Sequence, residues 1–199
     1  MAEKIAAPKG FEILDTRTWL SAREASEMFG AILESGMASP ACFGVGINGA
    51  ILDGVIYDGQ WRKRRVPAPR GRFSAAVTFA ARMIPRLKGV LSAEESGIKT
   101  LLLEGIQMHY NLGTYPIARV RGFHEDQGGY LRVLTSLLGD GVLYQDERGR
   151  ERRLAEGETL VMTTLKRRSV CGGRIAATRH CSPATMGPRL LLILDVVPP

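Results

Sequence analysis

An imidazole and a carboxylate two residues apart, His124 and Asp126, have a spacing that suits metal binding. Alternate residues of an extended chain point the same way, so both face one side while Glu125 faces the other. Far downstream, His180 supplies a second imidazole. Two imidazoles and one carboxylate can occupy one face of a ferrous ion and leave its other positions open. The pattern predicts an iron site made by His124, Asp126 and His180.

Arg189 follows His180 and begins the last apolar run of the chain. Its planar guanidinium suits bidentate binding of a carboxylate. A His-x-Asp pair alone is a weak signal, but the pair followed by a distant histidine and then by an arginine on the final strand is more specific. The third histidine, His109, has no partner at a useful spacing, and we interpret it as an ordinary strand residue. Cys181 should point away from its neighbour His180, and we interpret it as structural.

The elements that must hold these residues are short strands. From residue 100 onward, apolar runs alternate with Gly, Asp and Glu clusters, a texture typical of strands joined by turns. The expected strands are 101–110, 117–123, 130–138, 142–145, 159–165, 175–180 and 190–197. The expected turns are 139–141, 147–149 and 156–158.

Two helices are expected in the first half of the chain. Ser21 and Glu24 have the spacing of a capping box, in which each side chain binds the other residue's backbone amide at a helix start. The helix that follows has one apolar face, made of Ala25, Met28, Phe29, Ile32 and Leu33. A second helix is expected at 74–87, with Pro85 bending or ending it.

A hairpin is expected between the helices. Strands at 42–47 and 50–57 flank Asn48-Gly49, a dipeptide favoured in tight hairpin turns. The stretch 44–49 also spells GxGxxG, but a nucleotide-binding fingerprint must open a helix. The residues that follow here read as a strand, so we reject a dinucleotide-binding fold.

The segment from Trp61 to Arg72 is strongly basic and contains two prolines, which favour an extended loop. Such a loop could bind phosphates while its tryptophan stacks on a base. The candidate nucleic-acid contacts are Trp61, Arg62, Arg64 and Arg65. A solvated connection between elements is an equally good interpretation.

The composition limits the classes of protein. The 199 residues fit one domain, with a helical and hairpin part at 1–99 and a strand-rich core at 100–199. The net charge of +7 favours an acidic or polyanionic partner, although many cytosolic proteins are merely basic. Three cysteines without a CxxC spacing argue against a disulfide framework and a structural zinc site. Without a long apolar run or a secretory signal, we expect a cytoplasmic protein and no membrane partner.

Helices first and short strands afterwards indicate an α+β fold that is mainly β. We expect a β-sandwich or jelly roll with the N-terminal helices packed on one side. Inward-facing residues from several strands of such a barrel meet at its mouth, where the metal triad and the arginine could converge.

Part of the chain resembles a known family. The segment from Tyr115 to Asp195 is similar to the double-stranded β-helix core of the iron(II) and 2-oxoglutarate-dependent dioxygenases. The positions that match the family's metal triad are His124, Asp126 and His180. Arg189 matches the arginine that binds the distal carboxylate of 2-oxoglutarate, and Tyr115 matches a tyrosine that helps to hold it. Tyr110 is a weaker candidate for the tyrosine's role.

The resemblance implies Fe(II), 2-oxoglutarate and dioxygen as cofactor and cosubstrates of a C–H hydroxylation or demethylation. Asp126 stands where halogenating relatives carry a small residue, which implies a hydroxylase or demethylase. The layout resembles that of the AlkB-type nucleic-acid demethylases, and 135–139 and 157–162 are similar to their core strands. The chain departs from that pattern at Asp195, where those enzymes carry a second arginine.

Three functions remain open at this level. A dioxygenase that acts on a DNA or RNA base would need segment 61–72 beside the metal mouth. A hydroxylase of an amino acid, peptide or natural product would need a closed pocket with a few polar groups. A non-catalytic jelly-roll binding protein would need His124 and His180 to lie apart in space.

Overall fold

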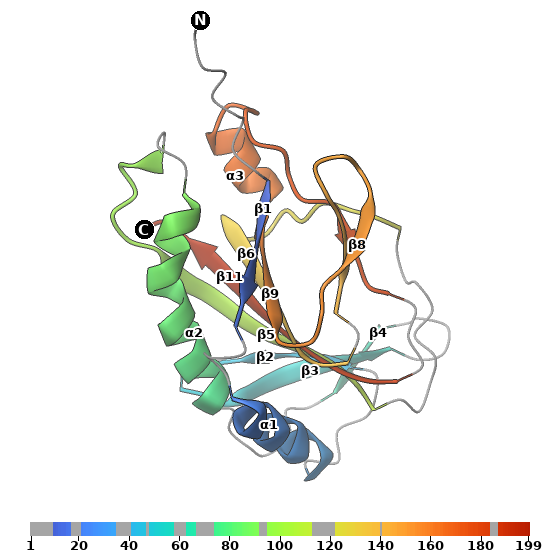
Figure 1. The fold of residues 1–199 in the computed structure, drawn as a ribbon. Coiled ribbons are helices and arrows are strands. Elements are labelled where there is room, and N and C mark those ends of the chain that lie inside the picture. Colours follow the sequence, from blue (N-terminus) through green and yellow to red (C-terminus); the bar gives the residue numbers. More distant parts are fainter. Residues whose placement is uncertain are drawn as a thin grey trace, which may run out of the picture.

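The fold consists of two antiparallel sheets with helices on one side (Figure 1). The computed structural model describes residues 10–16, 21–34, 41–46, 48–57, 63–66, 74–91, 95–112, 122–139, 141–183 and 187–199. The strands are β1 (Phe11–Asp15), β2 (Ala41–Val45), β3 (Ile51–Tyr57), β4 (Lys63–Val66), β5 (Leu102–Leu112), β6 (Leu131–Leu138), β7 (Leu143–Gln145), β8 (Glu151–Arg153), β9 (Glu158–Thr163), β10 (His180–Cys181) and β11 (Pro188–Val197). The helices are α1 (Ala22–Glu34), α2 (Ser74–Leu87) and α3 (Leu165–Val170), with a 3-10 turn, η1, at Lys88–Val90.

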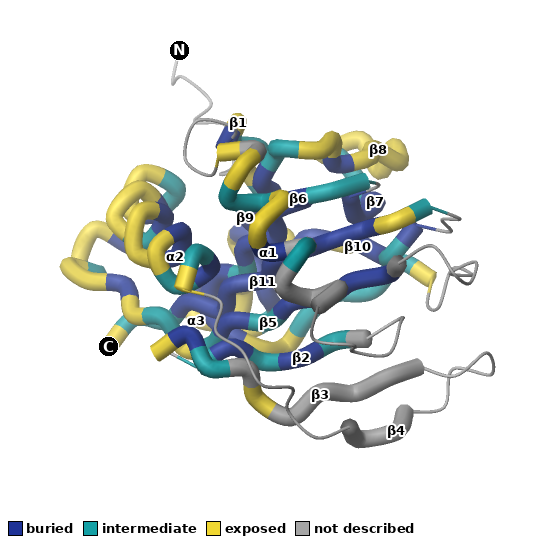
Figure 2. The backbone as a smooth tube through the Cα atoms, turned by 90° about the horizontal axis from the view of Figure 1, so that it is seen from below, coloured by how far each residue is buried: buried dark blue, intermediate teal, exposed yellow. Residues whose placement is uncertain are grey.

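The large sheet has eight strands in the order β1-β9-β6-β11-β5-β2-β3-β4, and the small sheet has three in the order β10-β7-β8. The N-terminal strands β1 to β4 therefore extend the large sheet at both edges. Figure 2 shows that burial concentrates in the central strands, whereas β8 and the outer side of α2 are exposed. The mainly β, jelly-roll fold class predicted from the sequence is confirmed.

One face of the large sheet packs against α2. The helix buries Ala76, Phe79, Ala80, Met83 and Leu87. Alternate residues of the two central strands complete this core, among them Met108, Tyr110, Leu190, Leu192 and Leu194. The prediction of helices on one side of the sheet therefore holds, and the bounds predicted for the second helix agree with α2.

The opposite face of the large sheet points toward the small sheet. Its apolar residues form a second core that includes Leu134, Leu160, Met162, Leu191 and Ile193. Because side chains alternate along a strand, the β11 row that contains Leu191 and Ile193 also contains Arg189 and Asp195. The inner face is therefore apolar in its middle and carries charged residues toward both ends of β11.

The local signals at the N-terminal elements are confirmed. The backbone amide of Ser21 donates to Glu24 Oε2 at 2.8 Å, and the Glu24 amide donates to Ser21 Oγ at 3.1 Å. Gly49 adopts φ 80° in the turn between β2 and β3, which is a conformation that glycine tolerates best. A strand follows the GxGxxG stretch, so the rejection of a nucleotide fold was right.

Several predicted strand bounds were wrong. The strand expected at 159–165 ends at Thr163, because Thr164 begins α3 by accepting a hydrogen bond from the Arg167 amide. Of the strand expected at 175–180, only the end at His180 pairs in a sheet. The Thr178 amide instead donates to Thr163 O, so this segment crosses between the sheets. Three strands, β1, β4 and β8, were not predicted, and neither were α3 and the 3-10 turn η1; β4 lies in the segment expected to be a loop.

Candidate metal site

His124 and His180 lie side by side, although they are distant in the sequence. Each residue's backbone amide donates to the carbonyl of the other at 3.0 Å, which makes an isolated antiparallel bridge. Their ring centroids are 4.5 Å apart. The non-catalytic alternative required the two histidines to lie apart, and that condition is not met. His180 sits on β10, whose pairing with β7 fixes its backbone.

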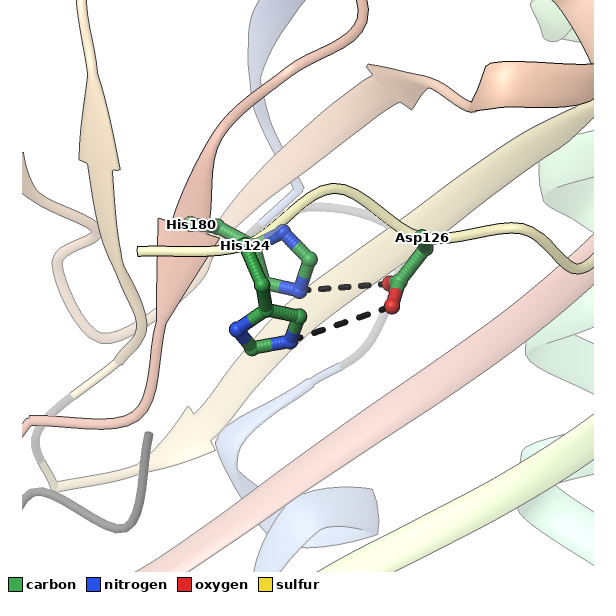
Figure 3. A group of neighbouring side chains, drawn as sticks. All are labelled: His124, Asp126 and His180. Atoms are coloured by element: carbon green, nitrogen blue, oxygen red, sulfur yellow. Dashed lines mark ion pairs between the residues drawn. The ribbon is translucent and has the colours of Figure 1, made fainter. Parts of the chain in front are cut away.

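The carboxylate of Asp126 points at both imidazoles (Figure 3). Its Oδ2 atom is 3.2 Å from His180 Nε2, and its Oδ1 atom is 3.9 Å from His124 Nε2. Glu125 turns away toward α3, where its carboxylate is 3.8 Å from Arg168. The predicted division between two facing residues and one bystander is thus observed.

The loop that carries Asp126 is fastened to the start of α3. The Leu165 amide donates to Asp126 O at 2.9 Å. The Thr164 hydroxyl lies 2.9 Å from Gly129 O and 3.1 Å from Tyr130 O. A short helix that was not predicted therefore supports the backbone between a predicted ligand and β6.

Electrostatics keep the Asp126 carboxylate ionised. Burial alone would raise the pKa of Asp126, but the hydrogen bond and charge of His180 and the guanidinium of Arg132 hold it well below its ordinary value. An ionised carboxylate beside two imidazoles is a hard, anionic ligand set.

The three side chains fit a ferrous ion. One ligand atom from each of the residues lies within 4.8 Å of the others, in the set His124, Asp126 and His180. Nδ1 of His124 is 3.1 Å from Gly122 O, and a hydrogen bond donated by Nδ1 to this carbonyl would leave Nε2, the ring nitrogen nearer Asp126, as the metal ligand. Two imidazoles and one carboxylate on one side, with the other side open, are the donor set that non-haem iron(II) prefers.

Arg189 is buried on the inner row of β11, where only 4% of its surface is exposed. A planar guanidinium in this place could bind a carboxylate through two parallel hydrogen bonds. Its register partner on β5 is Asn111, which is fully buried. Both residues lie on strands at the centre of the large sheet.

His109 is a residue whose position the sequence did not reveal. It lies opposite Leu191 of the inner row, and within the described chain its Nε2 atom is buried without a hydrogen-bond partner. Burial, followed by the charges of Arg189 and Arg132, lowers the pKa of His109 to about 4, while Asp126 opposes this shift. The histidine interpreted above as an ordinary strand residue is therefore a neutral imidazole within electrostatic reach of the candidate site.

The structure describes only some of the other residues predicted for the site. Tyr115, Trp61 and Arg62 lie outside the described residues. The backbones of Arg64 and Arg65 belong to β4, the edge strand of the large sheet. Tyr110 stacks edge-on against Phe43, with ring centroids 5.8 Å apart, in the core on the helix side of the sheet, and not on the face of His109.

Arg132 was missed entirely. It binds both Asp126 and Asp195, with its Nη1 atom 2.7 Å from Asp126 Oδ2 and its Nε atom 2.7 Å from Asp195 Oδ1. The only sequence signal for this contact was that Arg132 is the one charged residue in its strand.

Comparison with known proteins gives structural but no sequence matches. No family model matches the chain, and no curated protein matches it. A candidate oxygenase from Shewanella oneidensis matches with a TM-score of 0.61 at 12% identity, over 96% of this chain and 83% of that chain. The collagen prolyl hydroxylase of Paramecium bursaria Chlorella virus-1, in complex with 2-oxoglutarate, matches with a TM-score of 0.58 at 11% identity, over 96% and 97% of the two chains.

A third match is a Neurospora crassa protein in complex with 2-oxoglutarate and 5-formyluracil. Its TM-score is 0.50 at 13% identity, over 95% of this chain and 74% of that chain. These likenesses, all below 25% identity, establish the shared fold. None of the described helices is long and apolar enough to span a membrane.

Proposed function

We propose that this chain is an iron(II)- and 2-oxoglutarate-dependent oxygenase. The observation that carries the proposal is the convergence of two distant histidines on one ionised carboxylate, on a fold shared with solved oxygenases. The residues that would hold the iron are His124, Asp126 and His180. When bound, the iron and 2-oxoglutarate supply oxidative decarboxylation by dioxygen, which yields succinate and carbon dioxide and leaves one oxygen atom in a substrate C–H bond.

The other residues of the inner face have supporting roles. Arg189 would bind the distal carboxylate of 2-oxoglutarate through its planar fork, with Tyr115 as a second contact. The neutral imidazole of His109 could accept or donate one hydrogen bond in the same region without adding a charge. The buried apolar residues Leu191 and Ile193 would keep water from this side of the site.

A nucleic-acid base is the substrate class that we propose first. Its support is the net charge of +7, which favours a polyanionic partner. The basic strand β4 adds nothing to this support, because it lies at the edge of the large sheet with β3, β2 and β5 between it and β11. The Neurospora crassa fold neighbour binds 5-formyluracil, a modified base. A hydroxylase of a peptide, an amino acid or another small molecule is the second candidate, in keeping with the viral collagen prolyl hydroxylase among the neighbours.

The activity test follows succinate release from 2-oxoglutarate in the presence of Fe(II) and oxygen. Wild type should release succinate, and His124→Ala should reduce the rate to background because it removes a ligand. Arg189→Met should raise the KM for 2-oxoglutarate roughly 10- to 100-fold, since a lost charge-assisted hydrogen bond costs about 1.5–3 kcal/mol. Lys166→Ala, an exposed change on α3, is the matched control and should behave as wild type. Equal rates for wild type and His124→Ala would sink the proposal.

The substrate test compares single-stranded DNA, RNA, peptides and amino acids as stimulants of succinate release. For the nucleic-acid candidate, DNA binding should weaken steeply with salt and should weaken further in an Arg64→Ala, Arg65→Ala double variant. Stimulation by a peptide or an amino acid alone, with DNA binding unchanged in the double variant, would favour the second candidate.

A further inference from the structure

Arg132 links the candidate metal ligand Asp126 to a second carboxylate. It lies on β6, directly across from Asp195 of β11 in the strand register. Its Nε and Nη2 atoms bind the two oxygens of Asp195 at 2.7 and 2.9 Å, and its Nη1 atom binds Asp126 Oδ2 at 2.7 Å. All three side chains are largely buried, with exposed fractions of 17%, 15% and 10% for Arg132, Asp126 and Asp195.

The loop before β6 is shaped to permit these contacts. Gly129 adopts φ 69°, and a Cβ atom there would lie 3.2 Å from Asp195 Oδ1 and 3.1 Å from Leu131 O. A Cβ atom on Gly128 would lie 3.3 Å from Arg132 Nη2. The two glycines thus let the chain turn tightly between Asp126 and Arg132 while the guanidinium stays beside it.

The contacts divide the two oxygens of Asp126 between different partners. Oδ2 lies against Arg132 and His180, while Oδ1 is turned toward His124. Because Arg132 is itself held by Asp195 at two points, it cannot rotate freely away from Oδ2. The carboxylate plane of Asp126 is therefore fixed by a partner that is not itself a candidate ligand.

We propose that Arg132, held by Asp195, is a positioning residue for the metal site: it fixes the Asp126 carboxylate so that Oδ1 is presented to the ion. This inference rests on the proposed function. Asp195 also keeps the charge of the group favourable, since one guanidinium shared between two carboxylates leaves a net negative charge beside the cation. Without Asp195, Arg132 would neutralise Asp126 alone and compete with the metal.

A purely structural role for the pair is the alternative. β6 and β11 already pair along their backbones from Leu131 to Leu138, so the Arg132–Asp195 contact adds one side-chain pair to a ladder that exists without it. Replacing both members of a buried ion pair by apolar residues of similar size is often neutral for stability. The two roles can therefore be separated by measuring metal affinity and stability in the same double variant.

The experiment titrates Co(II), a spectroscopic substitute for Fe(II), into the full chain and follows visible absorption, with thermal unfolding measured in parallel. The Arg132→Met, Asp195→Leu double variant should unfold somewhat below the wild-type temperature, because Asp126 keeps its contact with His180 but loses its cation. It should bind Co(II) roughly 10- to 100-fold more weakly, as expected for loss of a residue that orients a ligand. Arg132→Lys should show an intermediate loss of Co(II) affinity, because one ammonium cannot bridge both carboxylates. This variant provides the test if the double variant does not fold.

The matched control is Arg168→Met, which removes a cation beside Glu125 without touching a candidate ligand, and its Co(II) affinity should equal that of wild type. Co(II) affinity within twofold of wild type in the folded double variant, or in Arg132→Lys, would overturn the positioning role and leave the proposed function standing. A wild-type chain that does not bind Co(II) would overturn both.

Discussion

At the scale of single residues, the chemistry of this molecule depends on charges that meet on the inner face of the large sheet. Asp126, Arg132 and Asp195 form a chain of ion pairs, and Arg189 lies on the same row of β11 as Asp195. His109 is held neutral among them by burial and by the neighbouring cations. Each residue takes its role from the others, because a buried charge is tolerated only beside a partner.

His109 should make the stability of the fold depend on pH. Its pKa is about 4 in the folded chain and 6.5 ordinarily, so between these values the unfolded chain binds a proton that the folded chain does not. The free energy of unfolding is therefore unaffected by His109 above pH 6.5. As the pH falls toward 4, protonation of His109 in the unfolded chain lowers the free energy of unfolding by roughly 3 kcal/mol at most. Urea unfolding at pH 7, 5.5 and 4.5 should show a shallower decline in His109→Asn than in wild type. Parallel declines in the two proteins would contradict this account.

At the scale of elements, α3 supports the loop that carries Asp126. Arg167 is buried under this helix, where its Nε and Nη2 atoms bind the two oxygens of Glu95 at 2.9 and 2.7 Å. Its Nη1 atom binds Thr163 Oγ1 at 3.0 Å. The helix is thus fastened to the chain after η1, and Thr164 at its start reaches the loop that carries Asp126.

Removing one member of the Arg167–Glu95 ion pair should lower the free energy of unfolding far more than replacing both members by apolar residues. Arg167→Met should destabilise the fold by roughly 3–5 kcal/mol, because it leaves the Glu95 carboxylate buried without its cation. The Glu95→Leu, Arg167→Met double variant should recover most of that loss. Urea unfolding measures both, and the exposed Arg168→Met is the control on the same helix. A double variant that is less stable than the single one would show that the attraction within the ion pair exceeds the cost of removing its two charges from water.

At the scale of the whole molecule, the candidate metal site joins the two sheets. His180 comes from the small sheet, whereas Asp126 lies on the loop that leads into β6 of the large one. A metal bound by both therefore links parts of the chain that separate on unfolding. Its binding free energy should then add to the stability of the fold.

Metal should accordingly protect the chain from heat. Mn(II) at a hundred times its Kd should add about 2.7 kcal/mol to the free energy of unfolding, or roughly 5–10 °C for a chain of this size. Scanning calorimetry with Mn(II), and again after addition of EDTA, should show the rise and its reversal. His180→Ala should show no rise. An equal rise in that variant would place the bound metal elsewhere.

Much of the fold could be predicted because its signals are local. The periodicity at 74–87 predicted α2, the Asn48-Gly49 pair predicted the hairpin, and the Ser21–Glu24 spacing predicted the start of α1. Elements without a local signal were missed. β8 is a fully exposed Glu-Arg-Arg strand that exists through its pairing with β7, and α3 has six residues, too few to show a helical period.

By itself the sequence determined which side chains could bind a metal, since residue types and the His-x-Asp spacing already define a ligand set. It also predicted that strands would carry them, which holds for His180 on β10, whereas His124 makes only an isolated bridge and Asp126 lies on the loop before β6. Only the tertiary structure decided that His124 and His180 pair backbone to backbone, that Arg132 binds both Asp126 and Asp195, and that His109 faces the same interior. The physical reason is that these relations join segments far apart in the sequence, where no tight turn fixes which strands pair or in which register.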